Sequence, residues 1–208
     1  MSPSRDCPLC PRLSDFRLVQ RAVHGDWFNA PVPAFGDLAA RLLIVGLAPG
    51  LKGANRTGRP FTGDYAGDLL YATLLKFGFA VGNYDRRPDD GLALVDCRIT
   101  NAVRCVPPQN KPTPEEARTC RAFLASEIAA MPKLAMILAL GQLAHNEALS
   151  TLGQRRAAFP FKHGALHALA NGLVLADSYH CSRYNTNTGV LTAAMFENVF
   201  TGVRGRLA

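Results

Sequence analysis

A glycine-rich segment between residues 46 and 64 carries side chains that could do chemistry. It begins with the run Gly-Leu-Ala-Pro-Gly at residues 46–50, and Phe61 and Asp64 stand near its end. Glycine lets a backbone approach a ligand closely, and here an aromatic ring and a carboxylate follow just before an expected helix. Taken alone, the segment also suits a general phosphate-binding loop, although it lacks the Gly-Lys-Ser/Thr ending of a P-loop.

Two more polar segments follow stretches that are typical of strands. The first holds Asn101, whose side chain offers both a hydrogen-bond donor and an acceptor. The second starts at His180 and continues as Cys-Ser-Arg-Tyr-Asn to residue 185. Because ligands bind beyond the carboxyl ends of parallel strands, we expect these two segments and residues 48–64 to converge on one edge of a sheet and form an active site.

The cysteines indicate a metal or cluster site. Cys7 and Cys10 form a Cys-x-x-Cys pair, and Cys105 and Cys120 follow later among six cysteines in 208 residues. That number is too small for a disulfide scaffold, and the first residues show no apolar signal core. Four thiolates suit either a [4Fe–4S] cluster or a tetrahedral zinc ion, and their spacing alone does not separate the two. We expect the remaining cysteines to be a small core residue (Cys97) and an exposed loop residue (Cys181).

Composition restricts the class of protein. Lys plus Arg is 23 and Asp plus Glu is 16, which gives a net charge of +7. A basic balance favours polyanionic partners weakly, because neutralising phosphates releases counterions. No apolar run reaches the roughly 20 residues that span a bilayer. The sequence therefore predicts a soluble, cytoplasmic monomer, associated with the nucleoid if it binds DNA, with no membrane partner.

Alternating apolar strands and amphipathic helices predict the fold. Buried strands are expected at residues 42–47, 92–103, 134–140 and 173–176. Helices are expected at residues 14–24, 65–77, 113–131, 142–149 and 190–203, the third opened by a capping box at Thr113 and Glu116. This order implies an α/β fold: a single-domain, three-layer α/β/α sandwich over residues 1–208 with a central, largely parallel sheet. Residues 1–30 would form an N-terminal extension.

The three polar segments resemble motifs of the uracil-DNA glycosylase superfamily, in the form found in its family 5, the b-type enzymes. Residues 46–64 resemble the first motif, residues 100–113 the central uracil-reading and cluster-binding segment, and residues 180–189 the second motif. Two positions depart from the pattern. Cys181 replaces the proline of the usual His-Pro-Ser, which removes a fixed φ from the loop, and Leu47 stands where family 4 enzymes carry glutamate.

The resemblance implies a monofunctional hydrolase of base-excision repair that removes uracil from DNA and leaves an abasic site. Hypoxanthine and xanthine are further candidate substrates. The base must be swung out of the stack into a pocket. There Phe61 would stack on it, Asn101 would read its edge and Gly50 would supply backbone contacts. His180 would donate to uracil O2 as negative charge develops. Asp64 would activate or position water, and it is also well suited to cap the following helix.

The same resemblance extends to the cysteines. It favours a structural [4Fe–4S] cluster on Cys7, Cys10, Cys105 and Cys120, which would pin residues 1–30 to the region around residues 105–120. Candidate contacts to DNA phosphates, which position a duplex without reading its sequence, are Arg56, Lys111 and Arg183. Each of these cations could equally be a solvated surface charge.

Two other classes of function stay open at this point. A non-catalytic nucleic-acid-binding module with a four-cysteine metal site would keep the thiols, but would not need Asp64, Asn101 and His180 in their motifs. A hydrolase of free nucleotides would need a carboxylate cluster for Mg²⁺, and the adjacent pair at residues 89–90 gives it thin support.

Overall fold

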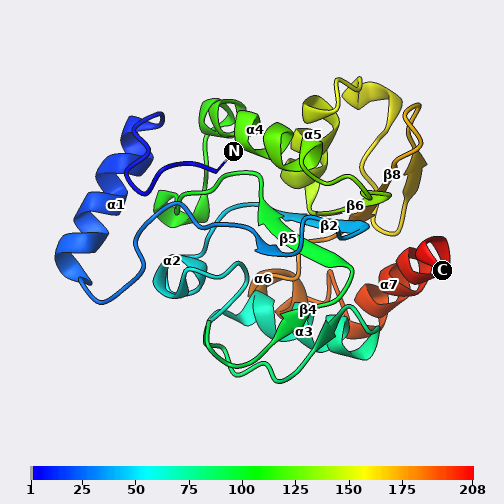
Figure 1. Cartoon of the computed structure of the whole chain (residues 1–208), viewed down its shortest axis with the longest axis horizontal. Coiled ribbons are helices and arrows are strands. Elements are labelled where there is room, and N and C mark those ends of the chain that lie inside the picture. Colours follow the sequence, from blue (N-terminus) through cyan, green and yellow to red (C-terminus); the bar gives the residue numbers. More distant parts are fainter. Residues whose placement is uncertain (1) are drawn as a thin grey trace.

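The computed structural model describes residues 2–208 and shows a central sheet with helices on both faces (Figure 1). Within these residues the main sheet has six strands, in the order β1 (Phe35–Gly36), β5 (Cys97–Asn101), β2 (Leu42–Gly46), β6 (Met136–Leu140), β8 (Val174–Ser178) and β7 (Leu166–Ala168). The four central strands run parallel, and each edge strand pairs antiparallel with its neighbour. The expected α/β fold with a largely parallel sheet is confirmed.

Alternate side chains of the central strands face opposite helical layers. One layer contains α3 (Tyr65–Lys76) and α7 (Ala193–Leu207), and the other contains α4 (Pro114–Ala129) and α5 (Gln142–Thr151). Along β2, Leu42 and Ile44 join the apolar cluster with α3 and α7, whereas Leu43 and Val45 join the cluster with α4 and α5. Both faces are therefore buried, which is why this strand reads as a continuous apolar run.

One expected strand is divided in two. Residues 92–103 form β4 (Ala93–Leu94), which pairs with β3 (Ala80–Val81) in a separate small sheet, and then β5. The chain turns between them at Asp96, which has φ 51, and the Asp96 carboxylate accepts the main-chain N–H and the Nε–H of Arg41. The prediction of a single strand was wrong because a positive φ ends the extended conformation.

The main helices lie where they were expected, with ends that differ by up to four residues. The capping box is present: Thr113 Oγ1 accepts from the main-chain N–H of Glu116, and Glu116 Oε2 accepts from that of Thr113. Shorter helices are α2 (Ala54–Thr57) and α6 (Arg183–Asn187), with 3₁₀ turns at Pro108–Asn110 and Arg156–Ala158. Across residues 2–208, none of the helices combines the length and apolar character that a membrane crossing requires.

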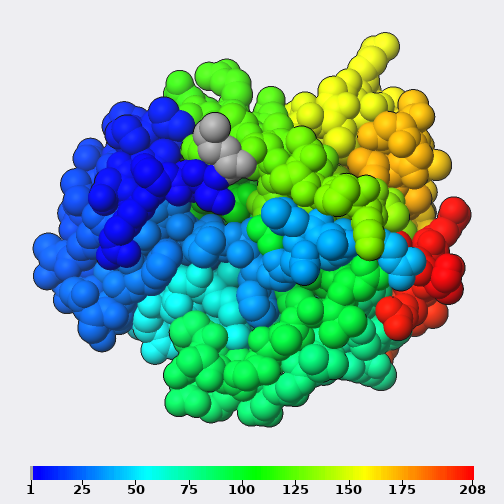
Figure 2. Space-filling model, in the orientation of Figure 1, coloured from blue at the N-terminus to red at the C-terminus, as the bar shows by residue number. Residues whose placement is uncertain are grey.

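The N-terminal segment lies along one side of the molecule (Figure 2). Its helix α1 (Pro11–Val23) is tied there by a two-pronged ion pair in which Arg12 Nε and Nη2 bind the two carboxylate oxygens of Glu116 at 2.8 and 2.7 Å. Such bidentate geometry fixes orientation as well as distance. It brings Cys7 and Cys10 close to α4, which carries Cys120.

Candidate active site

A cavity of about 600 Å³ opens beyond the carboxyl ends of β2, β5 and β8. The chain passes from β2 to β5 on one side and later to β6 on the other, so the cavity lies where the strand order reverses, which is where open α/β sheets bind ligands. Its walls combine segments that are far apart in the sequence. They include six residues singled out from the sequence: Gly50, Phe61, Asp64, Asn101, His180 and Arg183.

Asn101 lines this cavity and carries an unpaired hydrogen-bond acceptor. It is the last residue of β5, it is 3% exposed, and its Oδ1 has no hydrogen-bond partner among residues 2–208. Leaving a buried acceptor unpaired costs about 1–3 kcal/mol, so a ligand N–H would relieve that cost. The neighbouring Gly46 makes room, since a Cβ there would lie 2.4 Å from Asn101 Oδ1 and 2.6 Å from Phe61 Cζ.

Phe61 presents an aromatic ring at the cavity wall from a strained backbone. Its φ is 53, a conformation that costs a bulky residue about 1–3 kcal/mol and is often held in place at binding sites. The Tyr84 hydroxyl donates to the Phe61 carbonyl at 3.2 Å and helps to hold it. The ring centroid lies 5.9 Å from that of His180, so a flat ligand in the cavity would meet both rings.

Asp64 serves the helix and the cavity with different oxygens. It is the N-cap of α3, and its Oδ1 accepts the main-chain N–H of Gly67 at 3.2 Å. Its Oδ2 faces the glycine turn: a Cβ would lie 2.3 Å from it at Gly53 and 2.9 Å at Gly50. Burial raises the pKa of the Asp64 carboxyl. Both roles expected from the sequence are therefore geometrically compatible.

His180 lies two residues beyond the end of β8 and is half-buried at the cavity wall. Burial lowers its pKa to about 4, so the ring is neutral near pH 7 and carries one donor and one acceptor nitrogen. Asn185 Nδ2 donates to the His180 carbonyl at 2.8 Å and holds its backbone. A neutral donor of this kind can stabilise developing negative charge without an ionised group of its own.

The four candidate ligand cysteines meet around one small cavity of about 10 Å³, formed by the N-terminal segment, residues 103–105 after β5, and α4. The fully buried Arg17 donates from Nη1 to Cys105 Sγ at 3.4 Å, and the main-chain N–H of Arg104 donates to Cys120 Sγ at 3.3 Å. Burial raises the pKa of Cys10 to about 11 and that of Cys105 to about 12. Binding iron or zinc there would therefore release protons.

Comparison with known sequences identifies the family. The family model described as the uracil DNA glycosylase superfamily matches residues 33–204. The chain belongs to this superfamily. A type-5 uracil-DNA glycosylase from Thermus thermophilus is 46% identical over 198 residues, which cover 93% of this chain and 90% of that protein. Type-5 uracil-DNA glycosylases from Pyrobaculum aerophilum and Mycobacterium tuberculosis are 41% and 42% identical over 93% of this chain, and over 86% and 75% of their own lengths.

The two departures from the superfamily pattern have different structural outcomes. Leu47 lines the cavity, and among the described lining residues Asp64 is the only acid, so any carboxylate chemistry falls to Asp64. Cys181 was expected to be exposed, which is wrong: it is fully buried in the cluster with α3 and α7, and burial raises its pKa. The side chain points into the core while the adjacent His180 faces the cavity.

Of the three candidate phosphate contacts, one lines the cavity and two are not among its described lining residues. Arg183 is exposed and lines the cavity. Arg56 and Lys111 are also exposed, but neither is among the described lining residues. Lys52 and Asn110 do line the cavity and were not singled out from the sequence. The signal for Lys52 was present, because it is the one cation in residues 48–54.

Proposed function

We propose that this chain is a monofunctional uracil-DNA glycosylase, which hydrolyses the bond between uracil and deoxyribose in DNA and leaves an abasic site. The observation that carries the proposal is the unpaired, buried Oδ1 of Asn101, a residue that lines one cavity together with Phe61, His180 and Asp64. The relatives named type-5 uracil-DNA glycosylases support it. Asp64, Asn101 and His180 are the proposed catalytic residues.

Asn101 would select the base. Its Oδ1 accepts the N3–H of a flipped uracil, and its Nδ2 donates to O4, while the Phe61 ring stacks on the base and Gly50 borders it. Cytosine would present an unprotonated N3 to Oδ1 and an amino group to Nδ2. Both polar groups would then be mispaired, which is the kind of mismatch that gives strong discrimination.

His180 and Asp64 would serve the bond-breaking step. As the bond breaks, its electron pair goes to uracil N1 and spreads onto O2, where His180 donates a hydrogen bond that strengthens with the charge. Asp64 faces the cationic sugar, positions a water and takes its proton as the oxygen attacks C1′. The uracil anion takes up a proton from solvent and Asp64 releases the proton it took from water, so the products are uracil and an abasic deoxyribose. No amine nucleophile is needed, which distinguishes this route from that of a lyase.

We further propose that Cys7, Cys10, Cys105 and Cys120 hold a [4Fe–4S] cluster. All four cysteines line one small cavity, as a site for a single four-thiolate cluster requires. Such a cluster would supply a structural link only, pinning residues 1–30 to β5 and α4 within a single domain.

Hypoxanthine and xanthine in DNA are further candidate substrates, and Arg56, Lys111 and Arg183 are candidate phosphate contacts. We expect a cytoplasmic, nucleoid-associated monomer. The binding-module alternative shares the cysteines, but it gives no reason for an unpaired Asn101 acceptor beside Asp64.

The experiment is an excision assay on protein purified without oxygen. A labelled duplex with one uracil is incubated with the protein and heated in alkali, and matched duplexes carry thymine, cytosine, hypoxanthine or xanthine. Cleavage at uracil, no covalent adduct on borohydride treatment, and a brown protein with a band near ~400 nm are the expected results. A colourless zinc protein that leaves every duplex intact would support the binding module instead.

A further inference from the structure

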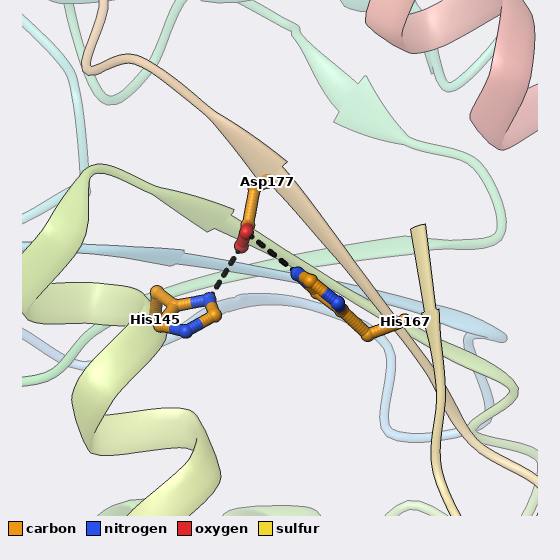
Figure 3. Close-up of side chains that lie close together, drawn as sticks. All are labelled: His145, His167 and Asp177. Carbon is orange, nitrogen blue, oxygen red and sulfur yellow. Dashed lines mark hydrogen bonds and ion pairs between the residues drawn. The ribbon is translucent and has the colours of Figure 1, made fainter. Parts of the chain in front are cut away.

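Outside the active-site cavity, three polar side chains meet in the interior beside β8 (Figure 3). Asp177 of β8 is fully buried, with Oδ1 2.7 Å from His145 Nδ1 and Oδ2 3.0 Å from His167 Nε2. The main-chain N–H of Lys162 also donates to Oδ2, at 3.3 Å. His145 comes from α5 and His167 from β7. None of these side chains takes part in the excision steps proposed above.

The surroundings of His145 fix the protons in this cluster. Its ring is 1% exposed, and both nitrogens face oxygen: Nδ1 faces Asp177 Oδ1, and Nε2 lies 2.8 Å from the Phe159 carbonyl oxygen. A carbonyl oxygen only accepts, so Nε2 carries a proton. A second proton must lie between Nδ1 and Oδ1, because two lone pairs would otherwise face each other. Taken together, His145 and Asp177 then carry no net charge, which lowers the cost of burying them.

This pair is connected to the segment that carries His180. Asp177 precedes His180 by three residues, and the next residue, Ser178, accepts the main-chain N–H of Gly141 at 2.8 Å. Gly141 is the N-cap of α5, and its carbonyl accepts the main-chain N–H of His145 at 3.1 Å. A Cβ on Gly141 would lie 3.5 Å from His180 Cβ. The N-terminal end of α5 therefore lies beside His180, and the buried pair fastens α5 to β8.

We propose that His145 and Asp177 are positioning residues for His180: their shared proton holds the start of α5 against the end of β8 and so sets where the His180 ring stands over the leaving base. This inference rests on the proposed function, in which His180 acts on uracil O2. A misplacement of about 1 Å costs up to about 100-fold in rate, so loosening this attachment should slow the chemical step more than it weakens DNA binding.

Two substitutions at one position separate the bond to Asp177 from the bond to Phe159. His145→Asn places an amide nitrogen near the position of Nδ1 and can still donate to Asp177. His145→Gln places it near the position of Nε2, where it reaches the Phe159 carbonyl and leaves Asp177 Oδ1 without a proton. Under single-turnover conditions we expect His145→Gln to excise uracil about 10- to 100-fold more slowly, with half-saturating DNA changed less than about 2-fold. His145→Asn should stay within about 3-fold of the native rate.

The matched control is Glu147→Gln on the same helix. Glu147 is buried and binds Arg121 and Arg156 on another side of α5, so its loss should lower the melting temperature without changing the excision rate. Equal losses of rate in both His145 variants, in proportion to their melting temperatures, would overturn the positioning role and leave a purely structural pair.

A measurement independent of activity completes the test. In ¹⁵N-histidine NMR spectra of the native protein, one of the five imidazoles should have a protonated Nε2 and an Nδ1 that shares a proton in a hydrogen bond, and this signal should be absent from the spectrum of His145→Gln. The His180 signals, assigned with a His180→Gln variant, should shift in His145→Gln and not in His145→Asn. One zinc or other divalent ion per chain besides iron, with His145 Nδ1 unprotonated, would overturn the proposal in favour of a metal site. If the native protein left uracil intact, the proposed function would fail, while these spectra would still decide how His180 is held.

Discussion

Replacing Asp64 with asparagine removes a negative charge from the cavity while keeping an oxygen at the start of α3. The two oxygens of Asp64 have separate surroundings: Oδ1 caps the helix at Gly67, and Oδ2 faces the turn at Gly50 and Gly53. Asparagine caps helices about as well as aspartate does, whereas alanine does not. Asp64→Asn and Asp64→Ala therefore separate the contribution of the charge from that of the cap.

The structure gives the size of each effect. Loss of the cap in Asp64→Ala should cost about 1 kcal/mol, which lowers the melting temperature of a chain of this size by about 2–4 °C. Asp64→Asn should melt no lower than the native protein at pH 7. The pKa of Asp64 is raised in the folded state, so the folded state binds the proton more tightly than the unfolded state. The native protein consequently loses stability as pH rises through that pKa, and the neutral amide avoids this loss.

If the carboxylate handles water in the reaction, both variants lose activity together. A positioned base contributes about 10²- to 10⁴-fold, so single-turnover excision of uracil should fall at least about 100-fold in Asp64→Asn and in Asp64→Ala. Alkaline cleavage of a labelled duplex measures the rate, and a circular dichroism melt with an iron assay measures folding. An Asp64→Asn protein that kept its rate within about 3-fold would refute the reasoning and leave Asp64 as a helix cap alone.

Three further predictions concern other groups. His180→Ala should slow excision about 100-fold. Because the His180 pKa is lowered to about 4, the unfolded state takes up a proton between about pH 6.5 and 4 that the folded state does not. The melting temperature of the native protein should therefore decrease as the pH is lowered across this range, and it should decrease less in the variant. Arg183→Ala should reduce the slope of log affinity against log salt by about 1, whereas Arg118→Ala, on an exposed part of α4, should leave the slope unchanged; equal slopes in all three proteins would remove Arg183 from the DNA contact. Arg17→Leu removes the donor to Cys105 Sγ, so the ~400 nm absorbance should decay faster in air, and decay at the native rate would show that this hydrogen bond does not protect the cluster.

The parts of the fold that could be predicted from sequence are those with a local cause. Strands β2 and β6 are buried on both faces, so every residue in them is apolar, and the run itself marks the strand. The start of α4 was predictable because the side chains of Thr113 and Glu116 each accept a hydrogen bond from the main-chain N–H of the other residue, within one turn. The residues of the cavity came from motif resemblance, and the structure shows that six of them line one cavity.

Features that depend on distant partners could not be predicted in this way. The break at Asp96 depends on Arg41, which lies 55 positions away, and the state of His145 depends on Asp177, which lies 32 positions away. No motif or spacing in the sequence therefore marks His145 or His167 for such a role. The unpaired Oδ1 of Asn101 is also invisible there, because being unpaired is a property of all its neighbours together.

The loop after β8 shows how a missing proline can be replaced. Proline would fix φ at the position of Cys181, and its absence suggested a looser loop around His180. Instead, the Cys181 side chain is fully buried in the core, Asn185 Nδ2 donates to the His180 carbonyl, and Ser182 Oγ accepts the main-chain N–H of Asn185 as the cap of α6. Three separate attachments thus restrain the backbone on both sides of position 181. A proline ring would restrain the backbone at position 181 by itself. Here the buried Cys181 side chain and two side-chain hydrogen bonds restrain it together, so His180 can remain fixed at the cavity wall without a proline beside it.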